Sequence, residues 1–195
     1  MHGDARRHRW LRRLVAAVAI LATAGPLGAQ VGAVGNPRVL TLSAVKPGTL
    51  TVGVLSGMVQ NLANVQDNML NTWPTPVVII TQWNVNPGQT NTVDLMAYFA
   101  TPVQAMVGGA TQIPSSRIRG RMTTGLPVAF AAFTQNAVGG IGTVSGSLRL
   151  FSQTITGINK NSSRTDNLDL QLDLTGTTLP PGTYTGTLNI RAVTQ

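Results

Sequence analysis

The alternation of apolar and polar residues in short segments is the feature that most constrains the fold of this chain. The clearest case is Asn167–Gly176, where leucine occupies every second position and the residues between are mostly polar. A β-strand points successive side chains to opposite faces of a sheet, so this pattern predicts a strand with one buried and one wet face. Similar segments recur along the chain, separated by turns rich in glycine, proline and asparagine. The sequence therefore predicts a single all-β domain, an immunoglobulin-like antiparallel sandwich of about eight or nine strands.

The expected strands follow one another at short intervals. Pro76–Trp83 is apolar on both faces as far as Ile80, which predicts a position in the middle of the sandwich. The full set of expected strands is Arg38–Ala44, Thr49–Leu55, Pro76–Trp83, Thr92–Phe99, Arg117–Thr123, Val128–Thr134, Val144–Ser152, Asn167–Gly176 and Thr183–Ala192. We expect the last of these to complete the protein's own sandwich beside Asn167–Gly176, because the connection between them is short.

The segment Gly57–Asn71 does not fit the alternating pattern. Its apolar residues Met58, Leu62, Val65 and Met69 have the spacing of a helix face, but the segment is rich in asparagine and has no strong cap. We expect a loop with a short strand near Met58–Leu62, and one short helix is the alternative.

Residues 1–29 have the features of a secretory signal peptide. Five arginines and a single aspartate, Asp4, precede the apolar run Leu14–Ala24, and small residues follow. The run is shorter than the roughly 20 residues that span a bilayer, so no stable span is expected after cleavage, and an uncleaved anchor is the alternative. Cleavage is expected after Ala29, with Ala33 as the competing site, and leaves 30–195 as the β-sandwich domain. The chain is therefore expected in the periplasm, on the outer surface or outside the cell.

Charge and composition limit the partners of the exported domain. The whole chain carries a net charge of +8, but residues 30–195 hold nine basic and five acidic residues, which leaves +4. This mild charge does not predict nucleic-acid binding. The chain has no cysteine, so no disulfide stabilises the fold. The sequence does not set an oligomeric state.

The absence of several residue types excludes most catalytic sites. Both histidines, His2 and His8, lie in the leader, and the chain has no cysteine and no glutamate. A Ser-His-Asp triad, a Cys-His pair and an ordinary zinc site cannot be built from the exported residues. Two catalytic sites are still possible on composition: a pair of aspartates, and a Ser-Lys dyad with the spacing Ser43-x-x-Lys46. The dyad needs a helix, but Pro47 directly follows Lys46 and indicates a turn. We therefore expect that the protein is not an enzyme and that it binds no cofactor.

Arg117, Arg119 and Arg121 form the candidate binding face. Side chains two apart on a strand point the same way, roughly 6 to 7 Å apart, so the three guanidinium groups would form a column. Such a column suits an anionic glycan or lipid headgroup. The alternative is a solvated face, or positive charge that protects a sheet edge from aggregation.

A second column is acidic. Asp169 and Asp173 lie on the polar face of the leucine-rich segment with Gln171 between them, and Asp166 lies just before. A straight strand supplies too few oxygens for calcium, so no metal site is expected. The column is interpreted as the wet face of a half-buried strand, which a neighbouring arginine-bearing strand could pair with.

The aromatic residues are too sparse to predict a carbohydrate platform. Several fall on the apolar side of their strands, so we expect them to pack in the core, with Trp83 and Tyr184 at its centre. Trp73 lies beside Pro74 in a loop-like stretch and is expected at the surface.

Three long segments resemble a group of uncharacterised exported bacterial proteins: Ile80–Phe99, Leu150–Gly176 and Leu179–Gln195. Proteins of that group have a leader, one β domain and an ending of the form L-P-x-G-T-Y-T-G-T-L. The ending is also similar, more loosely, to the last strands of spore-coat-U and fimbrial-subunit domains, which implies an immunoglobulin-like sandwich. Fimbrial subunits often carry a disulfide near their start, and its absence here argues against polymerisation by strand exchange. No catalytic residue carries over from either resemblance.

The sequence thus predicts an exported, non-enzymatic structural or adhesive protein of a bacterial envelope or surface. Its expected partners are other envelope or surface proteins, or anionic glycans. The first alternative is a secreted or periplasmic module that binds an anionic glycan through Arg117, Arg119 and Arg121. A small aspartate-dependent hydrolase is the less favoured alternative.

Overall fold

The computed structural model describes residues 48–195 of the protein. The leader, the expected strand Arg38–Ala44 and the Ser43–Lys46 motif lie outside the described residues. Within residues 48–195, no helix has the length and apolarity needed to cross a bilayer.

The described residues form eleven strands and two short 3₁₀ helices. The strands are β1 (Thr49–Ser56), β2 (Leu70–Thr72), β3 (Val77–Asn84), β4 (Thr92–Tyr98), β5 (Met106–Gly108), β6 (Thr111–Ile113), β7 (Ile118–Met122), β8 (Ala131–Ala132), β9 (Ser147–Thr154), β10 (Asn161–Asp173) and β11 (Asn189–Thr194). The 3₁₀ helices are η2 (Pro102–Gln104) and η3 (Ser115–Arg117).

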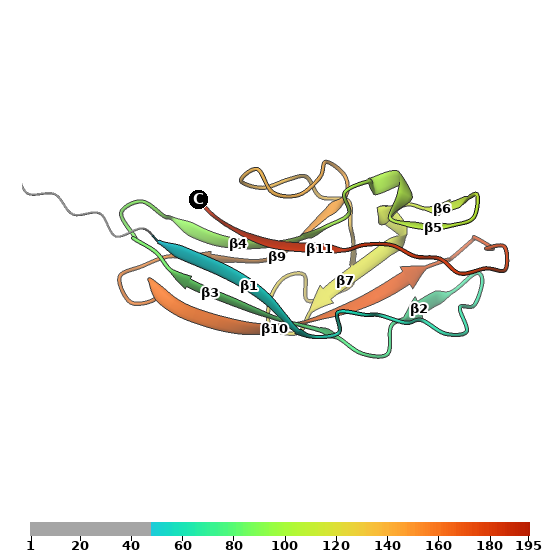
Figure 1. Ribbon diagram of the computed structural model, residues 1–195, viewed down its shortest axis with the longest axis horizontal. Helices are drawn as coiled ribbons and strands as arrows, with labels where there is room; N and C mark the ends of the chain where they lie inside the picture. Colours follow the sequence, from blue (N-terminus) through green and yellow to red (C-terminus); the bar gives the residue numbers. More distant parts are fainter. Residues whose placement is uncertain (1–47) are drawn as a thin grey trace, which may run out of the picture. The chain divides into compact units, whose positions relative to one another are not determined.

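The strands form two main sheets that face each other (Figure 1). The larger sheet has the order β1-β3-β10-β7-β8, with β2 also paired to β10, and the smaller has the order β11-β4-β9. A separate hairpin joins β5 and β6. All the strand pairs are antiparallel. The prediction of an all-β antiparallel sandwich is confirmed.

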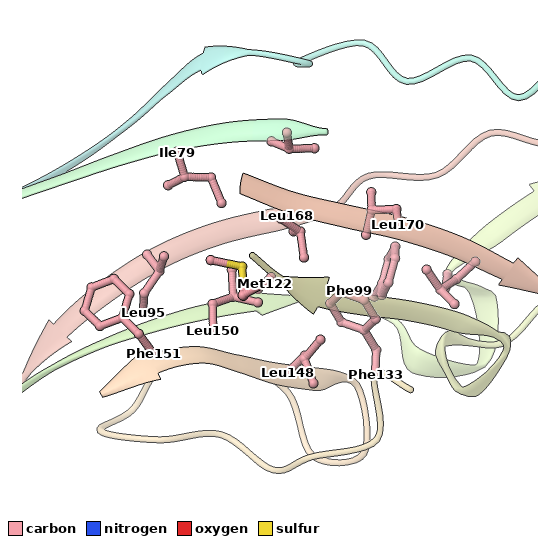
Figure 2. Packing of buried hydrophobic residues seen from close by; sticks show 14 of the residues in the cluster. Ile79, Leu95, Phe99, Met122, Phe133, Leu148, Leu150, Phe151, Leu168 and Leu170 are labelled. Carbon is pink, nitrogen blue, oxygen red and sulfur yellow. The ribbon is translucent and has the colours of Figure 1, made fainter. Parts of the chain in front are cut away.

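The core lies between the two sheets (Figure 2). Leu168 and Leu170 of β10 face it from the larger sheet, and Leu95 of β4 faces it from the smaller. Phe99 and Phe133 pack edge to face, with ring centroids 5.2 Å apart. The apolar faces read from the alternating segments therefore meet as expected.

The longest strand, β10, is longer than the sequence pattern predicted. Its first residues, Asn161–Asp166, are polar and were not expected in a strand, but they pair with β3 in register. Further along β10, β2 pairs with the same edge as β3, and β7 pairs with the opposite edge of β10. Because β10 is paired on both sides, it holds the larger sheet together.

Three local features differ from the sequence analysis. Val128–Thr134 contributes only β8, since the chain from Thr124 to Phe130 turns back and bonds the Leu126 N–H to the Leu150 carbonyl. A bulge in β9 places both Leu150 and Phe151 in the core, against strict alternation. The hairpin of β5 and β6 was not expected.

The segment Gly57–Asn71 is a loop, as expected, that leads into β2. Neither the short strand near Met58–Leu62 nor the alternative helix is present. Asn64 and Asn68 have φ of 56° and 61°, a left-handed backbone that interrupts both strand and helix. Helical spacing of apolar residues was therefore misleading here.

The final strand is shorter than expected and lies in the other sheet. β11 pairs with β4 of the smaller sheet, so the connection from β10 crosses between the sheets instead of joining neighbours. The preceding Thr183–Leu188 leaves that sheet and makes a single bridge, from Thr185 to Val107 of β5. Gly186 lies against the carbonyl of Ala105, where a Cβ would have no room. β11 still pairs within its own chain.

Two aromatic residues differ from expectation. Trp73 is buried in the core rather than at the surface. Tyr184 is only half-buried, and its hydroxyl donates to the Pro180 carbonyl. Trp83 is buried as expected, and its indole N–H donates to the carbonyl of Asn159 at 2.8 Å.

Candidate functional site

The predicted arginine column lies at the junction of η3 and β7. Arg117 is the last residue of η3, and Arg119 and Arg121 lie on β7. Arg121 is opposite Asp169 of β10, and Arg119 is opposite Gln171. The three guanidinium groups therefore face the acidic column on the neighbouring strand.

The two columns pair with each other. Arg121 Nε donates to Asp169 Oδ2 at 2.9 Å, and Arg119 Nη1 lies 3.6 Å from Asp173 Oδ2. Arg117 Nη1 donates to the Thr175 carbonyl at 2.9 Å, and Arg121 also stacks on the ring of Phe130. The arginines of this face are thus engaged by the fold.

Hydrogen bonds and charge act together on Asp173. Burial on its own would raise the pKa of this carboxyl group, but the Thr175 N–H, the Thr175 hydroxyl and the charges of Arg119 and Arg117 lower it below its ordinary value of 3.8. The Thr175 N–H donates to Asp173 Oδ1 at 3.0 Å. Asp173 is therefore held ionised, which suits an ion-pair partner rather than a general acid.

The Arg face, defined as Arg117, Arg119, Arg121, Asp169 and Asp173, has three positive and two negative charges. Its net charge is +1, against +3 for the arginines counted alone. An incoming anion would compete with carboxylates that are already in place. The face can attract an anion weakly, but it does not present three free guanidinium groups.

A buried polar cluster lies between the sheets, and sequence analysis missed it. Asp166 has no exposed side-chain surface and accepts from Arg164 Nε at 2.6 Å and from the Thr124 hydroxyl at 2.6 Å. Arg164 also donates to the Thr124 carbonyl and stacks 4.2 Å from the ring centroid of Phe151. Phe151 belongs to β9, so the cluster links the two sheets. Asp166 and Arg164 are in phase with Leu168 along β10, and that phase could have revealed their inward direction.

Asp94 is the second buried carboxylate. It lies on β4, where its Oδ2 accepts from the Thr92 hydroxyl at 2.9 Å and from Gln195 Nε2 at 3.2 Å. Its Oδ1 lies 3.9 Å from Arg149 Nη1 and has no hydrogen-bond partner. Met96 on the same outer face of β4 is also fully buried. This face of the smaller sheet is therefore covered, and Asp94 is enclosed.

A groove opens where the edges of the two sheets separate, and it is called the seam groove here. It has a volume of about 540 Å³ and runs between Val54–Asn61 and the segment Thr183–Ile190. Its floor includes Trp73, Phe99 and Leu170. A second cavity of about 290 Å³ continues past Leu62 and Leu179. The lining of both is mainly apolar.

The groove offers an apolar binding surface but few ionisable side chains. None of the arginines, lysines or aspartates among residues 48–195 lines either cavity. Tyr184 is the one ionisable side chain in these linings, and its hydroxyl is already hydrogen-bonded. The five aspartates that the structure describes all accept hydrogen bonds from the protein itself: Asp67, Asp94, Asp166, Asp169 and Asp173.

Comparison of the chain with protein-family models, with curated proteins and with solved structures finds no match. The function is therefore proposed from the molecule's own residues.

Proposed function

We propose that the protein is an exported, non-catalytic structural or adhesive β-sandwich of a bacterial envelope or surface. The main support for the proposal is that the carboxylates of the domain bind other groups of the same fold. Each aspartate of the described domain is held by an internal partner, and none lines a cavity. Aspartate pairs are the main acid-base chemistry that the exported composition still allows, so the use of these groups in the fold supports a role through surfaces.

Export is supported by the leader pattern in residues 1–29. The resemblance of the segments Ile80–Phe99 and Leu179–Gln195 to exported bacterial proteins points the same way. A domain without cysteine would owe its stability outside the cell to burial and sheet pairing, as in the core between β4 and β10.

The test separates a surface role from a hydrolytic one. Cells of the native host that lack the gene should change in attachment or in envelope integrity, and the wild-type gene should restore them. A gene carrying Asp169→Asn should restore them equally, because Asp169 is a partly exposed ion-pair partner. A hydrolytic turnover by the purified protein that Asp169→Asn abolishes would overturn the proposal.

The alternative is an anionic-glycan module that uses the Arg face. Its support is the excess of one positive charge and the exposure of Arg121, whose side chain is 48% exposed. Retention on an anionic polysaccharide column at low salt, lost in Arg117→Ala/Arg121→Ala, would favour it. The same loss at Arg149→Ala, on the other sheet, would indicate general charge attraction instead.

A further inference from the structure

The seam groove and the second cavity beside it adjoin one another. Six residues line both of them: Gln60, Asn61, Trp73, Met106, Thr183 and Tyr184. The volume of the groove, about 540 Å³, lies within the range of roughly 300–1,000 Å³ that is usual for small-molecule sites. Figure 1 shows β1 and the chain entering β11 diverging where the groove opens. The two cavities together suit a small molecule of elongated shape.

The floor and the mouth of the groove are apolar. Trp73, Phe99 and Leu170 form part of the floor, and all three are buried. Met58 and Val59 lie in the lining and are 81% and 78% exposed, so apolar surface continues from the floor to the mouth. Apolar surface that is both exposed and continuous commonly marks a binding site.

The charge of the lining limits the occupant. The exported domain has a net charge of +4, but none of the charged side chains among residues 48–195 lines either cavity. A carboxylate or an ammonium group placed in the groove would lose water without gaining an ionic partner, which is costly. The groove therefore favours an uncharged molecule.

Unpaired backbone groups gather on one wall of the groove, in the segment Thr183–Leu188. The backbone N–H and C=O groups of Tyr184, Gly186 and Thr187 form no hydrogen bond with other residues of the described part of the chain. Gly186 and Thr187 are also exposed, so their backbone groups are open to water or to a ligand. This wall offers donors and acceptors to one end of an occupant.

The facing wall holds a further acceptor. Gln60 Nε2 donates to the Gly57 carbonyl at 3.0 Å, and this bond fixes which end of the amide is the oxygen. Gln60 Oε1 is then buried, without a hydrogen-bond partner among the described residues. A hydroxyl or an amide N–H group of an occupant is the kind of donor that this oxygen lacks.

We propose that the seam groove binds a neutral amphiphile, a molecule with one alkyl or acyl chain and an uncharged head that carries a hydroxyl or amide group. The chain lies over Trp73, Phe99 and Leu170 and extends toward the second cavity, and the head bonds Thr183–Leu188. An extended polypeptide suits the groove less well, because it brings a polar amide at every residue and the floor has no partner for them. The site does not depend on the proposed role at the surface.

Dye displacement tests the class of ligand. The full chain is exported, purified and titrated with N-phenylnaphthylamine, a neutral dye with an N–H group that fluoresces in apolar sites. Decanol, decanoate and decylammonium, which share one alkyl chain and differ in head charge, then compete with the dye. Decanol should act at concentrations about tenfold or more below those of either charged competitor. General charge attraction to this basic domain would favour decanoate instead.

A single cysteine locates the site, because the chain has none of its own. Thr187→Cys places a thiol at an exposed position in the lining. The unlabelled variant should bind the dye like the wild type, and coupling to N-phenylmaleimide should abolish binding by filling the mouth. The matched control is Thr165→Cys, which is exposed on β10 outside both linings. Its labelled form should bind the dye fully.

Each result decides the proposal. Dye binding that decanol displaces best, and that the label at position 187 alone abolishes, supports it. Absence of dye binding, equal displacement by the three competitors, or displacement mainly by decanoate would overturn it. Equal effects of the two labels would place the dye elsewhere and overturn it as well. A thiol at position 187 that does not react would show that the groove is already covered, by a second copy if the chain is a dimer, and would also overturn it.

Discussion

The ion pair between the half-buried Arg164 and the buried Asp166 gives the sharpest test of how this domain uses its charges. Arg164→Ala removes the partner of a carboxylate that has no exposed side-chain surface. It also removes a bond to the Thr124 carbonyl and the stacking on Phe151. The change should therefore leave the Asp166 side chain buried, with the Thr124 hydroxyl as its remaining hydrogen-bond partner.

The expected loss of stability is large for a single substitution. Removing one partner of a buried ion pair costs about 3–5 kcal/mol in free energy of unfolding. At about 2–4 °C per kcal/mol for a domain of this size, the melting temperature should fall by roughly 6–20 °C. The matched control is Arg121→Ala, which breaks an ion pair to Asp169 on the same strand β10 but at an exposed position. That change should cost about 0.2–1 kcal/mol for the pair, and about 0.5–1 kcal/mol more for the contact with Phe130.

Urea unfolding of the exported chain, followed by tryptophan fluorescence, measures the difference. Trp73 and Trp83 are both buried, so their emission reports the loss of the core. The double variant Arg164→Met/Asp166→Leu completes the comparison, since it removes both charges and fills the space with apolar side chains. It should be more stable than Arg164→Ala, because no charge is left buried without a partner. Equal losses from Arg164→Ala and Arg121→Ala, or a double variant less stable than Arg164→Ala, would refute the reasoning.

The remaining predictions concern one carboxylate, one glycine and the last strand. Because the folded pKa of Asp173 lies below its unfolded value of 3.8, its charged form contributes stability above that pH, and the contribution is lost as pH falls through the folded pKa. Asp173→Asn should therefore make acid unfolding between roughly pH 5 and pH 2 less steep, and an unchanged slope would contradict the lowered pKa. Gly120→Ala should cost about 1–3 kcal/mol in urea unfolding, because its Cβ would lie 2.9 Å from Leu148 Cδ2 and 3.1 Å from Leu168 Cδ1. Gly157→Ala, where nothing lies within 4 Å, is its control and should not destabilise. Deletion of Thr187–Gln195 should give an aggregating product on size-exclusion chromatography, because β4 loses its partner β11; a folded monomer would show that β11 is dispensable.

The strands with one apolar face were the predictable part of the fold. In β1 and β4 the alternation marked an element whose ends differ from the expectation by a residue or so, and in β3 the continuous apolar run did the same. A period of two is imposed by the strand itself, so it can be read without knowing what the strand packs against. The acidic column of Asp169 and Asp173 was also readable from its spacing, and the arginine-bearing neighbour that could pair with it is β7.

The features that depend on distant partners were not predictable. Asn161–Asp166 has no apolar alternation, and it is a strand because β3 supplies a continuous edge for it. Trp73 is buried because the chain after β2 continues along β10, with the Trp73 N–H bonded to the Leu170 carbonyl. Such contacts depend on residues about a hundred positions away.

The candidate site shows the same division. The common direction of the three arginines on the Arg face could be read from their spacing. The net charge of the face could not, because it depends on which acidic residues of β10 lie opposite β7. The seam groove arises from the divergence of β1 and β11, which belong to different sheets, and no local pattern marks it. The inward direction of Asp166 was readable, because it is in phase with Leu168.

Export is the premise on which the proposed surface role depends most. The direct measurement is the N-terminal sequence of the protein recovered from each cell fraction of the native host. The account predicts a processed chain that begins at Gln30 or Val34, found in the envelope or the medium. A mature pool that begins at Met1 and remains in the cytoplasm would contradict it.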